Sequence, residues 1–529
     1  MKEFDYIVVG GGAGGCAVAG RLSEDPGVSV CLLEAGKGDD QMLIKVPFCT
    51  ALMLPTPINN WAFETVPQPG LNGRRGYVPR GKVMGGSTSI NAMVYTRGHP
   101  WDFDHWAALG NAGWSWRDVL PYFRKSEHNE DFAGEYHGQD GPLNVAKLRS
   151  LNPFQEIYLE AARQTGFKLI DDFNGPDQEG IGIYQVMQKN GERWNAARAY
   201  LNSHLAGRRN LTVITQARAR RILFAGKRAS GVEFLQGGQV HSFTAKREVI
   251  LAAGAIQSPQ LLMLSGIGAG AELQQHGIPV VHELPGVGKN LQDHPDYIFN
   301  YRAKSLDLLG ISLGGSLRLM QEVSRYRRER TGMMTSNGAE GGGFLRRFAD
   351  SPAPEFQLHF VVGMIDSHAR KLHLGHGYSC HVCLLRPKSI GTLGLASADP
   401  AAAPVIDPKF YDHPDDLDAM VDGFKLTRKL MDAPVLAGIR TGELYSAGIH
   451  FDEAIREELK NRSDTIYHPV GTCKMGSDAM AVVDARLRVH GLEALRVVDA
   501  SIMPTLVGGN TTAPTLMIGE KAADMIRAG

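Results

Sequence analysis

A chain of 529 residues is too long for one ordinary domain and predicts two or more, with ample capacity for buried cores. Lys and Arg together number 56, as do Asp and Glu, so the net charge is zero. This balance disfavours a nucleic-acid partner, which would want a basic excess, while the 43% hydrophobic content and 62 glycines are typical of a globular α/β enzyme.

The chain opens on an apolar strand candidate, FDYIVVG, that begins at Phe4. Glu3 and Asp5 flank this start and oppose a signal peptide, so none is expected. No run of 18 apolar residues occurs, so we expect no transmembrane helix, and peripheral membrane contact stays open. Six scattered cysteines without a secreted spacing pattern predict reduced thiols in a cytoplasmic protein.

A glycine loop, Gly10-x-Gly12-x-x-Gly15, lies where the first strand would pass to a helix. The first glycine permits a tight turn, the second lets the backbone approach a pyrophosphate, and the third lets the helix pack on the strand. A second strand, VSVCLLEAG, carries Glu34, whose carboxylate can accept hydrogen bonds from ribose hydroxyls. This βαβ context predicts a dinucleotide site, but the loop alone does not choose between NAD and FAD.

Two further signatures follow, GKVMGGSTSINAMVYTRGHPWDFD at 81–104 and GAIQSPQLLMLSGIG at 254–268, the second after an apolar strand, EVILAAG. In the first, adjacent glycines and small hydroxyl residues let the backbone pass close to a flat or phosphate-bearing group. Near the C-terminus lie YHPVGTCKMG at 467–476 and GGNTTAPT at 508–515.

Together these five ordered motifs resemble the glucose–methanol–choline (GMC) oxidoreductases, FAD enzymes that oxidise alcohols. The resemblance runs from residue 4 to about residue 527 and is nearest to bacterial choline, sorbose, polyethylene glycol and aliphatic alcohol dehydrogenases. It departs at Met84, where an aliphatic such as Leu is usual, and this swap conserves volume.

The resemblance implies an α/β fold. Because the FAD-binding motifs lie at both ends of the chain, the FAD-binding domain should be discontinuous. We expect a discontinuous, Rossmann-like FAD-binding domain over 1–150, 195–300 and 460–529. A substrate-binding cap, built on an antiparallel sheet with helices, would take 151–194 and 301–459. Within the cap, EFQLHFVVGMI and GYSCHVCLLRP have the pattern of antiparallel strands.

The resemblance also implies which residues contact FAD. Some relatives bond the flavin covalently to a His at the position of Ile90, so the aliphatic residue here predicts non-covalent FAD. Met93 and Val94 could equally be core residues. The expected FAD-binding residues are Gly10, Gly12, Ala13, Gly14, Gly15, Glu34, Ala35, Val83, Gly85, Asn91, Ala92, Met93, Val94, Ala219, Ala253, Gly254, Asp499, Ala500, Thr511 and Thr512.

His468 and Asn510 match the family positions that face the reactive edge of the flavin. Oxidising R–CH₂OH needs the hydroxyl proton removed while a hydride leaves for flavin N5. A histidine can take that proton, and an uncharged amide can hold the oxygen without competing for it. Tyr467 would either shape the alcohol pocket or pack the loop. Glucose- and aryl-alcohol-type relatives and mandelonitrile lyases have a second His at the asparagine position, so Asn510 favours the choline, sorbose and aliphatic alcohol branch.

The expected function is therefore FAD-dependent oxidation of a primary, polyol or sugar-type alcohol to the aldehyde or ketone. A quinone- or dye-type electron acceptor is favoured over oxygen. The alternative is a lyase of the same fold, in which the flavin is not redox-active and His468 only transfers protons. A non-catalytic flavin-binding module would not need a His–Asn pair, and without a GxSxG motif a serine hydrolase is unsupported.

Three other segments carry weaker signals. HARKLHLGHGYSCHVC lacks four ligands at zinc spacing, and residues three apart on a strand point to opposite faces, so no metal site is expected. RYRRER, 325–330, predicts a solvated helix face. APTLMIGEKAADMIRAG predicts a C-terminal helix with Pro514 in its first turn, capped by Thr511 or Thr512, whose N-terminus points at the flavin pyrimidine.

Overall fold

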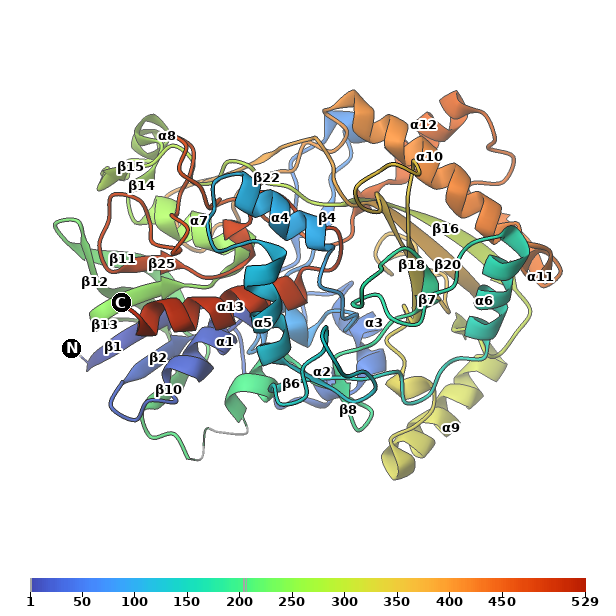
Figure 1. Ribbon diagram of the computed structural model, residues 1–529, viewed down its shortest axis with the longest axis horizontal. Helices are drawn as coiled ribbons and strands as arrows, with labels where there is room; N and C mark the ends of the chain where they lie inside the picture. The colour runs from blue at the N-terminus through green and yellow to red at the C-terminus, as the bar shows by residue number, and fades with distance from the viewer. Residues whose placement is uncertain (1, 203–204, 206) are drawn as a thin grey trace.

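The computed structural model describes residues 2–202, 205 and 207–529 and divides them between two regions, each built on its own β-sheet (Figure 1). The blue N-terminal strands, the green strands around residues 211–251 and the red C-terminal helix gather at one end of the molecule. The yellow and orange segments form the other end. Both termini lie in the first region, so the chain leaves it for the second and returns.

The first sheet is mostly parallel. β1 pairs in parallel with β2 and β13, β2 with β10, and β13 with β25, whereas β11 and β12 return antiparallel beside β13. Ile7 and Val8, which point to opposite faces of β1, are both fully buried, as expected where both faces of a parallel sheet are covered. The strands, in spatial order, are β10 (Leu211–Ile214), β2 (Val30–Leu33), β1 (Lys2–Val9), β13 (Gln239–Leu251), β12 (Arg228–Gln236) and β11 (Arg218–Ala225), with β25 (Leu495–Val497) beside β13.

The main helices of this region are α1 (Ala13–Leu22), α7 (Gly254–Leu264) and α13 (Thr512–Arg527), and the first two follow β1 and β13 after short loops. α1 and α13 pack closely through small side chains, since a Cβ on Gly519 would lie 2.7 Å from the Cβ of Ala17. A buried ion pair ties the same helices, with Nε of Arg21 2.8 Å from Oε2 of Glu520. The predicted C-terminal helix is confirmed, and it brings the last residues of the chain against the first.

The second sheet is antiparallel and forms the cap. The runs EFQLHFVVGMI and GYSCHVCLLRP become β19 and β20, which pair antiparallel as predicted. α10 packs on β20, and α12 packs on α10. The strands are β23 (Arg440–Leu444), β16 (Pro295–Ala303), β20 (Gly375–Leu384), β19 (Phe356–Val361), β18 (Gly341–Leu345) and β7 (Gly180–Ile183), with β17 (Gly310–Ile311) and β24 (Asp464–Thr465) at the edges, and the main helices are α6 (Phe154–Thr165), α9 (Leu313–Glu329), α10 (Pro414–Met431), α11 (Pro434–Ala437) and α12 (Asp452–Arg462).

The remaining helices and strands are short and lie outside the two main sheets. The helices are α2 (Met42–Lys45), α3 (Thr50–Met53), α4 (Pro100–Ala108), α5 (Trp116–Ser126) and α8 (Gly270–Gln275). The strand pairs are β3 (Phe63–Glu64) with β4 (Tyr77–Val78), β5 (Glu127–Asn129) with β6 (Leu143–Val145), β8 (Gln188–Lys189) with β9 (Glu192–Arg193), β14 (Ile267–Gly268) with β15 (His282–Glu283), and β21 (Thr392–Gly394) with β22 (Val405–Asp407).

The predicted fold class, α/β with a discontinuous FAD-binding domain and an antiparallel cap, is confirmed. The sheets place two boundaries differently. β16 begins at Pro295 and crosses the boundary predicted at 300/301, and β24 pairs with β16 although it lies beyond 460. In addition, Leu393 and Ile406 of β21 and β22 pack in the core of the first region, inside the segment assigned to the cap.

The segment rich in His and Cys forms the strand β20 and the loop before it. Cys380 packs in the main cap core and Cys383 in a separate apolar cluster with Phe344, so the two thiols point to opposite faces as predicted. All six cysteines are free. The RYRRER segment lies at the end of α9, where Tyr326 is buried and the arginines are largely exposed, which confirms a solvated helix face.

Candidate active site

The turn between β1 and α1 brings three backbone segments together. Gly10 has a φ of 105°, and a Cβ there would lie 2.4 Å from the carbonyl oxygen of Ala252, directly after β13. A Cβ on Gly15 would lie 1.8 Å from the oxygen of Gly10, so only glycine lets α1 pack this closely on the strand. The free N–H groups of the first turn of α1 therefore stand at the carboxyl edge of the sheet, where they favour an anion.

Glu34 follows β2 directly and is buried at the same edge. Its Oε2 accepts the N–H of Gly11 at 2.9 Å, and its Oε1 accepts the N–H of Gly36 at 2.7 Å. Burial raises the pKa of Glu34 to about 7, although these two hydrogen bonds and Lys82 act to lower it. Each carboxylate oxygen keeps a second lone pair, so the group can also accept hydrogen bonds from a ligand diol.

A cavity of about 170 Å³ runs along this edge of the sheet. Side chains that the sequence analysis did not single out, among them Trp61, Arg80, Arg218 and Gln257, also line it. The expected FAD-binding residues that line this first cavity are Gly10, Gly12, Ala13, Gly14, Glu34, Ala35, Ala219, Ala253, Gly254, Asp499, Ala500, Thr511 and Thr512.

Three expected FAD-binding residues lie behind the cavity wall. Gly15 serves the packing of α1, as described above. Gly85 donates its N–H to the oxygen of Gly11 at 2.7 Å and so joins the 81–94 segment to the glycine loop. Val83 packs in a small apolar cluster with Ile90. These residues do not line the cavity, but they position the backbone and the apolar side chains behind its wall.

A second cavity, of about 230 Å³, adjoins the first, and Arg80, Ser87, Thr511 and Thr512 line both. Met93 and Val94 line it and also pack in apolar clusters of the core. The expected site residues that line the second cavity alone are Asn91, Ala92, Met93, Val94, Tyr467, His468 and Asn510.

The N-terminus of α13 lies where the two cavities meet. The predicted cap is wrong, because α13 begins at Thr512 and the side chain of Thr511 makes no capping hydrogen bond. The hydroxyl of Thr512 instead accepts a hydrogen bond from Nδ2 of Asn91 at 3.3 Å. With no side chain over them, the first N–H groups of the helix stay available to an anionic ligand.

His468 and Asn510 meet in the second cavity. Nδ2 of Asn510 lies 3.1 Å from Nε2 of His468. The amide is oriented by its oxygen, which accepts hydrogen bonds from Oγ1 of Thr96 at 3.2 Å and from Nε2 of Gln357 at 3.0 Å. Since the oxygen is held by two donors, the NH₂ group must face the imidazole.

A second histidine fixes the tautomer of His468. Nε2 of His294 lies 3.1 Å from the oxygen of Leu385, which can only accept, so this nitrogen carries hydrogen. Nδ1 of His294 is then an acceptor, and it lies 3.0 Å from Nδ1 of His468. The hydrogen of His468 therefore lies on Nδ1, and the lone pair of its Nε2 faces the cavity and accepts the hydrogen bond from Nδ2 of Asn510.

The surroundings keep both imidazoles neutral. Burial, and then the neighbouring His294, His359 and Arg80, hold the pKa of His468 well below its ordinary value of 6.5. Burial lowers the pKa of His294 to about 3. Both rings are thus uncharged at neutral pH, and Nε2 of His468 is available as a proton acceptor.

Tyr467 is held by a separate chain of hydrogen bonds. Its hydroxyl lies 2.7 Å from Nδ1 of His368, whose Nε2 lies 2.8 Å from Oδ2 of Asp464. Ser367, His368 and Ala369 are three consecutive residues with φ values of 46°, 60° and 62°, so this contact fixes a loop in a costly left-handed conformation. Ala369 also lines the second cavity, so the loop forms part of its wall.

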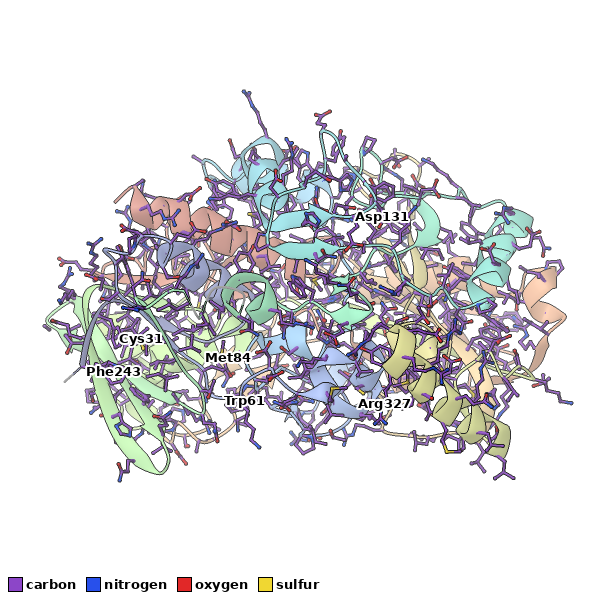
Figure 2. The ribbon with its side chains drawn as sticks, turned by 90° about the horizontal axis from the view of Figure 1, so that it is seen from below. Cys31, Trp61, Met84, Asp131, Phe243 and Arg327 are labelled. Carbon is purple, nitrogen blue, oxygen red and sulfur yellow. The ribbon has the colours of Figure 1, made fainter. Side chains whose placement is uncertain are left out.

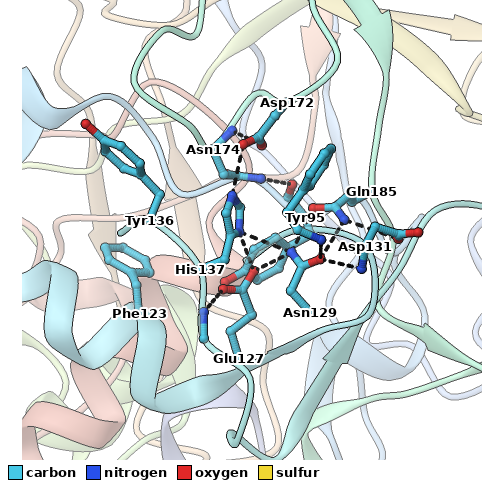
Figure 3. Close-up of polar contacts among 12 residues, drawn as sticks. Tyr95, Phe123, Glu127, Asn129, Asp131, Tyr136, His137, Asp172, Asn174 and Gln185 are labelled. Atoms are coloured by element: carbon cyan, nitrogen blue, oxygen red, sulfur yellow. Dashed lines mark hydrogen bonds and ion pairs between the residues drawn. The ribbon is translucent and has the colours of Figure 1, made fainter. Parts of the chain in front are cut away.

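A buried polar network supports the strand segment that carries Met93 and Val94 (Figure 3). Arg97 and Glu127 form a fully buried ion pair at 2.5 Å, and Nε2 of His137 lies 2.9 Å from Oδ2 of Asp172. Burial lowers the pKa of His137, but hydrogen bonds to Asp172 and Glu127 outweigh it and the pKa is raised. The network therefore ties the cavity-lining segment to β5 and to the segment around Asp172, which precedes β7.

Sequence reasoning missed His294 and His359, which lie beside His468, and Gln357, which donates to Asn510. One signal could have found His294: it stands before Pro295 in LQDHPD, as His468 stands before Pro469 in YHPVG. His359 and Gln357 lie inside the alternating pattern of β19, where nothing in the sequence separates them from ordinary strand residues.

Sequence profiles of the GMC oxidoreductases match residues 4–296 and 387–519 of the chain. The chain is a GMC oxidoreductase. The matched segments contain the glycine loop, both internal signatures, His468 and Asn510, and the resemblance drawn from the motifs is confirmed. The unmatched segment, 297–386, is the part of the cap that carries β16, α9, β18, β19 and β20.

This GMC oxidoreductase is similar along its whole length to curated relatives. It is 46% identical over 527 residues to the alcohol dehydrogenase (acceptor) of Pseudomonas putida, with 99% of this chain and 95% of the relative covered. It is 44% identical to an oxygen-dependent choline dehydrogenase of Klebsiella pneumoniae, with 99% and 96% covered. The GMC protein is an FAD-dependent oxidoreductase that acts on alcohols.

Solved structures share the fold of this GMC oxidoreductase. Pyridoxine 4-oxidase from Mesorbium loti superposes with a TM-score of 0.89 at 30% identity, with 99% of each chain covered. Formate oxidase of Aspergillus oryzae superposes with a TM-score of 0.91 at 29% identity, with 100% of this chain and 98% of the other covered. An FAD-binding domain combined with a substrate domain is therefore the architecture of this protein.

Proposed function

We propose that this protein oxidises an uncharged primary alcohol with an apolar chain to the aldehyde, and that Nε2 of His468 accepts the hydroxyl proton. The observation that carries the proposal is the orientation of this nitrogen. It is neutral, unprotonated and turned into the second cavity by the contact with His294. A base that is fixed in place and unprotonated at neutral pH can accept the proton of an alcohol.

The residues around the first cavity fit FAD, on three observations. Gly10 and Gly12 line the cavity, and the first turn of α1 offers N–H groups to a pyrophosphate. Glu34 offers carboxylate oxygens to a ribose diol at one end. The uncapped N-terminus of α13 lies at the other end, where the first cavity meets the second. When bound there, FAD supplies the acceptor for the hydrogen and the electron pair that leave the carbinol carbon.

The aliphatic Ile90 supports non-covalent binding of FAD. It lines the second cavity and is almost fully buried in the cluster around Val83. A hydrocarbon side chain offers no nucleophile at the position where the family resemblance implies a covalent histidine.

Asn510 and His468 are placed to share the substrate oxygen. In the ligand-free site the NH₂ group of Asn510 donates to Nε2 of His468, so an alcohol hydroxyl that donates to Nε2 takes over the lone pair now used by the amide. The freed amide can then donate to the same oxygen and stabilise the negative charge that develops on it. Tyr467, held by His368, limits the cavity beside the base.

The lining of the second cavity supports an apolar substrate. Its side chains are mainly hydrocarbon, including Phe48, Leu54, Leu309, Val361 and Ile365. Among the described residues that line it, none is Asp or Glu, and Arg80 is the one always-charged side chain. A quaternary ammonium substrate would lack a carboxylate in contact, and a polyol would place several hydroxyl groups against a wall that is mainly hydrocarbon.

A non-oxygen electron acceptor is part of the proposal. It is supported by the similarity to the alcohol dehydrogenase (acceptor) of Pseudomonas putida, at 46% identity. Steady-state rates with a quinone or dye should exceed those with oxygen, and the opposite order would make the protein an oxidase.

Anaerobic stopped-flow mixing with alcohols tests the proposal. Bleaching of the flavin absorbance by linear primary alcohols, with little or none by choline and glycerol, is the expected result. Reduction by choline in preference to an uncharged alcohol would contradict the assigned substrate class. Flavin that no alcohol reduces would overturn the oxidation itself and favour the lyase alternative.

A further inference from the structure

α9 is a long helix whose side chains are almost all outside the core. Among its 17 residues, Leu313–Glu329, only Tyr326 is buried, and the helix contacts β17 and the short turn η5 (Met333–Thr335). An amphipathic helix of a globular protein normally turns an apolar stripe towards the core. In Figure 1 α9 stands at the edge of the cap, and Figure 2 shows Arg327 on it, away from the sheet that carries Cys31 and Phe243.

The apolar side chains of α9 face solvent instead. Leu313, Leu317 and Met320 are 88%, 60% and 62% exposed. Their spacing of four and three residues puts them on one face of the helix. Exposed apolar residues in a contiguous row mark an interaction surface far more specifically than single ones do.

Two loops extend this row into a patch. Leu372 and Leu374 are 73% and 74% exposed, and Leu374 bridges to the exposed Ile311, two residues before α9. Leu306, also exposed, reaches the start of α9, where its Cδ2 lies 3.3 Å from the position a Cβ would take on Gly314. We call the surface of these side chains the leucine face: Leu306, Ile311, Leu313, Leu317, Met320, Leu372 and Leu374.

Basic side chains surround the leucine face. Between residues 302 and 330 the chain has seven Lys and Arg and three Asp and Glu, although the whole protein has no net charge. Within the described part of the chain, Arg302, Lys304 and Arg327 have no carboxylate at ion-pair distance, whereas Arg318 is neutralised by Asp307 at 2.8 Å. The surface thus combines exposed hydrocarbon with an uncompensated positive charge.

We propose that the leucine face docks this protein on the surface of a bilayer that contains anionic lipid. Leucine and methionine side chains can insert at the boundary between headgroups and acyl chains, while Arg302, Lys304 and Arg327 attract the lipid phosphates. The positive charge around the leucine face disfavours a second copy of this chain as the partner. In a two-fold symmetric dimer the basic side chains of one copy would lie against those of the other and repel them.

The docking surface borders the second cavity. Leu309 lies between Leu306 and Ile311, and Ile365 and Ala369 lie on the loop that continues to Leu372; all three line that cavity. A lipophilic alcohol dissolved in the bilayer would therefore meet the cavity wall nearest to the membrane. This last consequence rests on the proposed function, whereas the docking itself does not.

Co-flotation of the FAD-loaded enzyme with lipid vesicles tests the proposal. Binding to phosphatidylcholine vesicles with about 30% phosphatidylglycerol should exceed binding to pure phosphatidylcholine, and it should weaken as salt is raised. The double variant Leu313→Ser/Leu317→Ser should lose about tenfold or more in vesicle partition. Lys304→Ala/Arg327→Ala should lose about fivefold or more on anionic vesicles and little on neutral ones.

Matched controls come from the same chain. Phe451→Ser removes a side chain that is 80% exposed at the start of α12, and Arg117→Ala/Arg209→Ala removes two exposed arginines of the FAD-binding domain. Both should bind vesicles like the wild type. His468→Ala should also bind like the wild type, so a failure of docking and a failure of the proposed function give different results.

Three results would overturn the docking proposal. One is the absence of wild-type binding to anionic vesicles. Another is that Leu313→Ser/Leu317→Ser binds anionic vesicles as well as the wild type does. The third is a stable dimer in solution that this double variant dissociates, which would assign the leucine face to a second copy of the chain.

Discussion

Nδ2 of Asn510 donates to Nε2 of His468 over 3.1 Å, so the amide occupies the lone pair that an alcohol proton would use. The two residues are 42 positions apart and belong to separate loops, yet each is fixed from behind: His468 by His294, and Asn510 by Thr96 and Gln357. This geometry supports the proposal that the two side chains share one hydroxyl oxygen of the substrate.

His468→Ala should keep the fold and FAD and lose about 10²–10⁴-fold in the rate of flavin reduction, the usual contribution of a general base. Anaerobic stopped flow with a linear alcohol measures this rate. The loss should shrink at high pH, where hydroxide or the alkoxide partly substitutes for the base. A variant that reduces its flavin at nearly the wild-type rate would end the mechanism as proposed.

Asn510→Ala removes one hydrogen bond to an oxygen that becomes negatively charged, worth about 1.5–3 kcal/mol, so flavin reduction should slow roughly 10–150-fold. The pH dependence should persist, because an amide does not titrate. In the double variant with His468→Ala the loss should be smaller than the product of the single losses, since both residues act on one oxygen. Strictly multiplicative losses would mean that they do not share a substrate atom.

His294→Ala should slow flavin reduction by about twofold to tenfold, because the hydrogen bond that holds His468 in one tautomer is worth about 0.5–1.5 kcal/mol. His294→Gln is the matched variant. Its amide oxygen can accept from Nδ1 of His468 while its NH₂ group donates to the oxygen of Leu385, so most of the rate should return. Equal rates for the two variants would show that His294 acts through packing alone.

The rate of flavin reduction should be nearly independent of pH from neutral pH upwards and should fall only in acid. The direction of this pH dependence follows from the environment of His468. Burial and the neighbouring His294 hold its pKa well below 6.5, so the base is already deprotonated at neutral pH and becomes protonated only in acid. A pH series of single-turnover rates checks this, and a rate that keeps rising through pH 7–9 in proportion to hydroxide would contradict it.

Well above pH 7, where Glu34 with its raised pKa is ionised, Glu34→Gln should weaken FAD binding about tenfold to 150-fold, which matches a loss of about 1.5–3 kcal/mol for hydrogen bonds to a charged acceptor. Gln cannot accept at both positions, so the N–H of Gly11 or Gly36 would face an NH₂ group. Fluorescence titration of the apoprotein with FAD measures the change. Glu272→Gln, in the same domain and half exposed beside Lys289, is the control and should bind FAD like the wild type.

The prediction of the fold depended on local patterns, and it worked where such patterns set the backbone. The glycine loop needs Gly10 at positive φ and Gly15 at a contact that no Cβ could make, so its role could be predicted from the residues alone. The cap of α13 could not be predicted. Thr511 and Thr512 are both good capping residues, and Asn91, 421 positions before Thr512, decides that the hydroxyl of Thr512 faces the cavity instead.

The domain boundaries also could not be predicted from local sequence patterns. β16 looks like any apolar run, and only its pairing with β20, β23 and β24 shows that it belongs to the cap from Pro295 onwards. β21 and β22 lie within the segment predicted as cap, yet they pack on the core of the first region. The N–H of Leu393 in β21 donates a hydrogen bond to the oxygen of Gly288 there.

By itself the sequence determined the family, and it singled out the glycine loop, His468 and Asn510 as candidate site residues, because the motifs of the family are short, ordered and made of particular residue types. The tertiary structure alone decided which nitrogen of His468 can act as the base. A tautomer depends on what the other nitrogen touches, and His294 and Leu385 come from segments 174 and 83 positions away from His468. The tertiary structure alone also decided the exposure of the leucine face. From the sequence these leucines would be predicted to lie in the core, and only the packing of the cap shows that they lie on its surface.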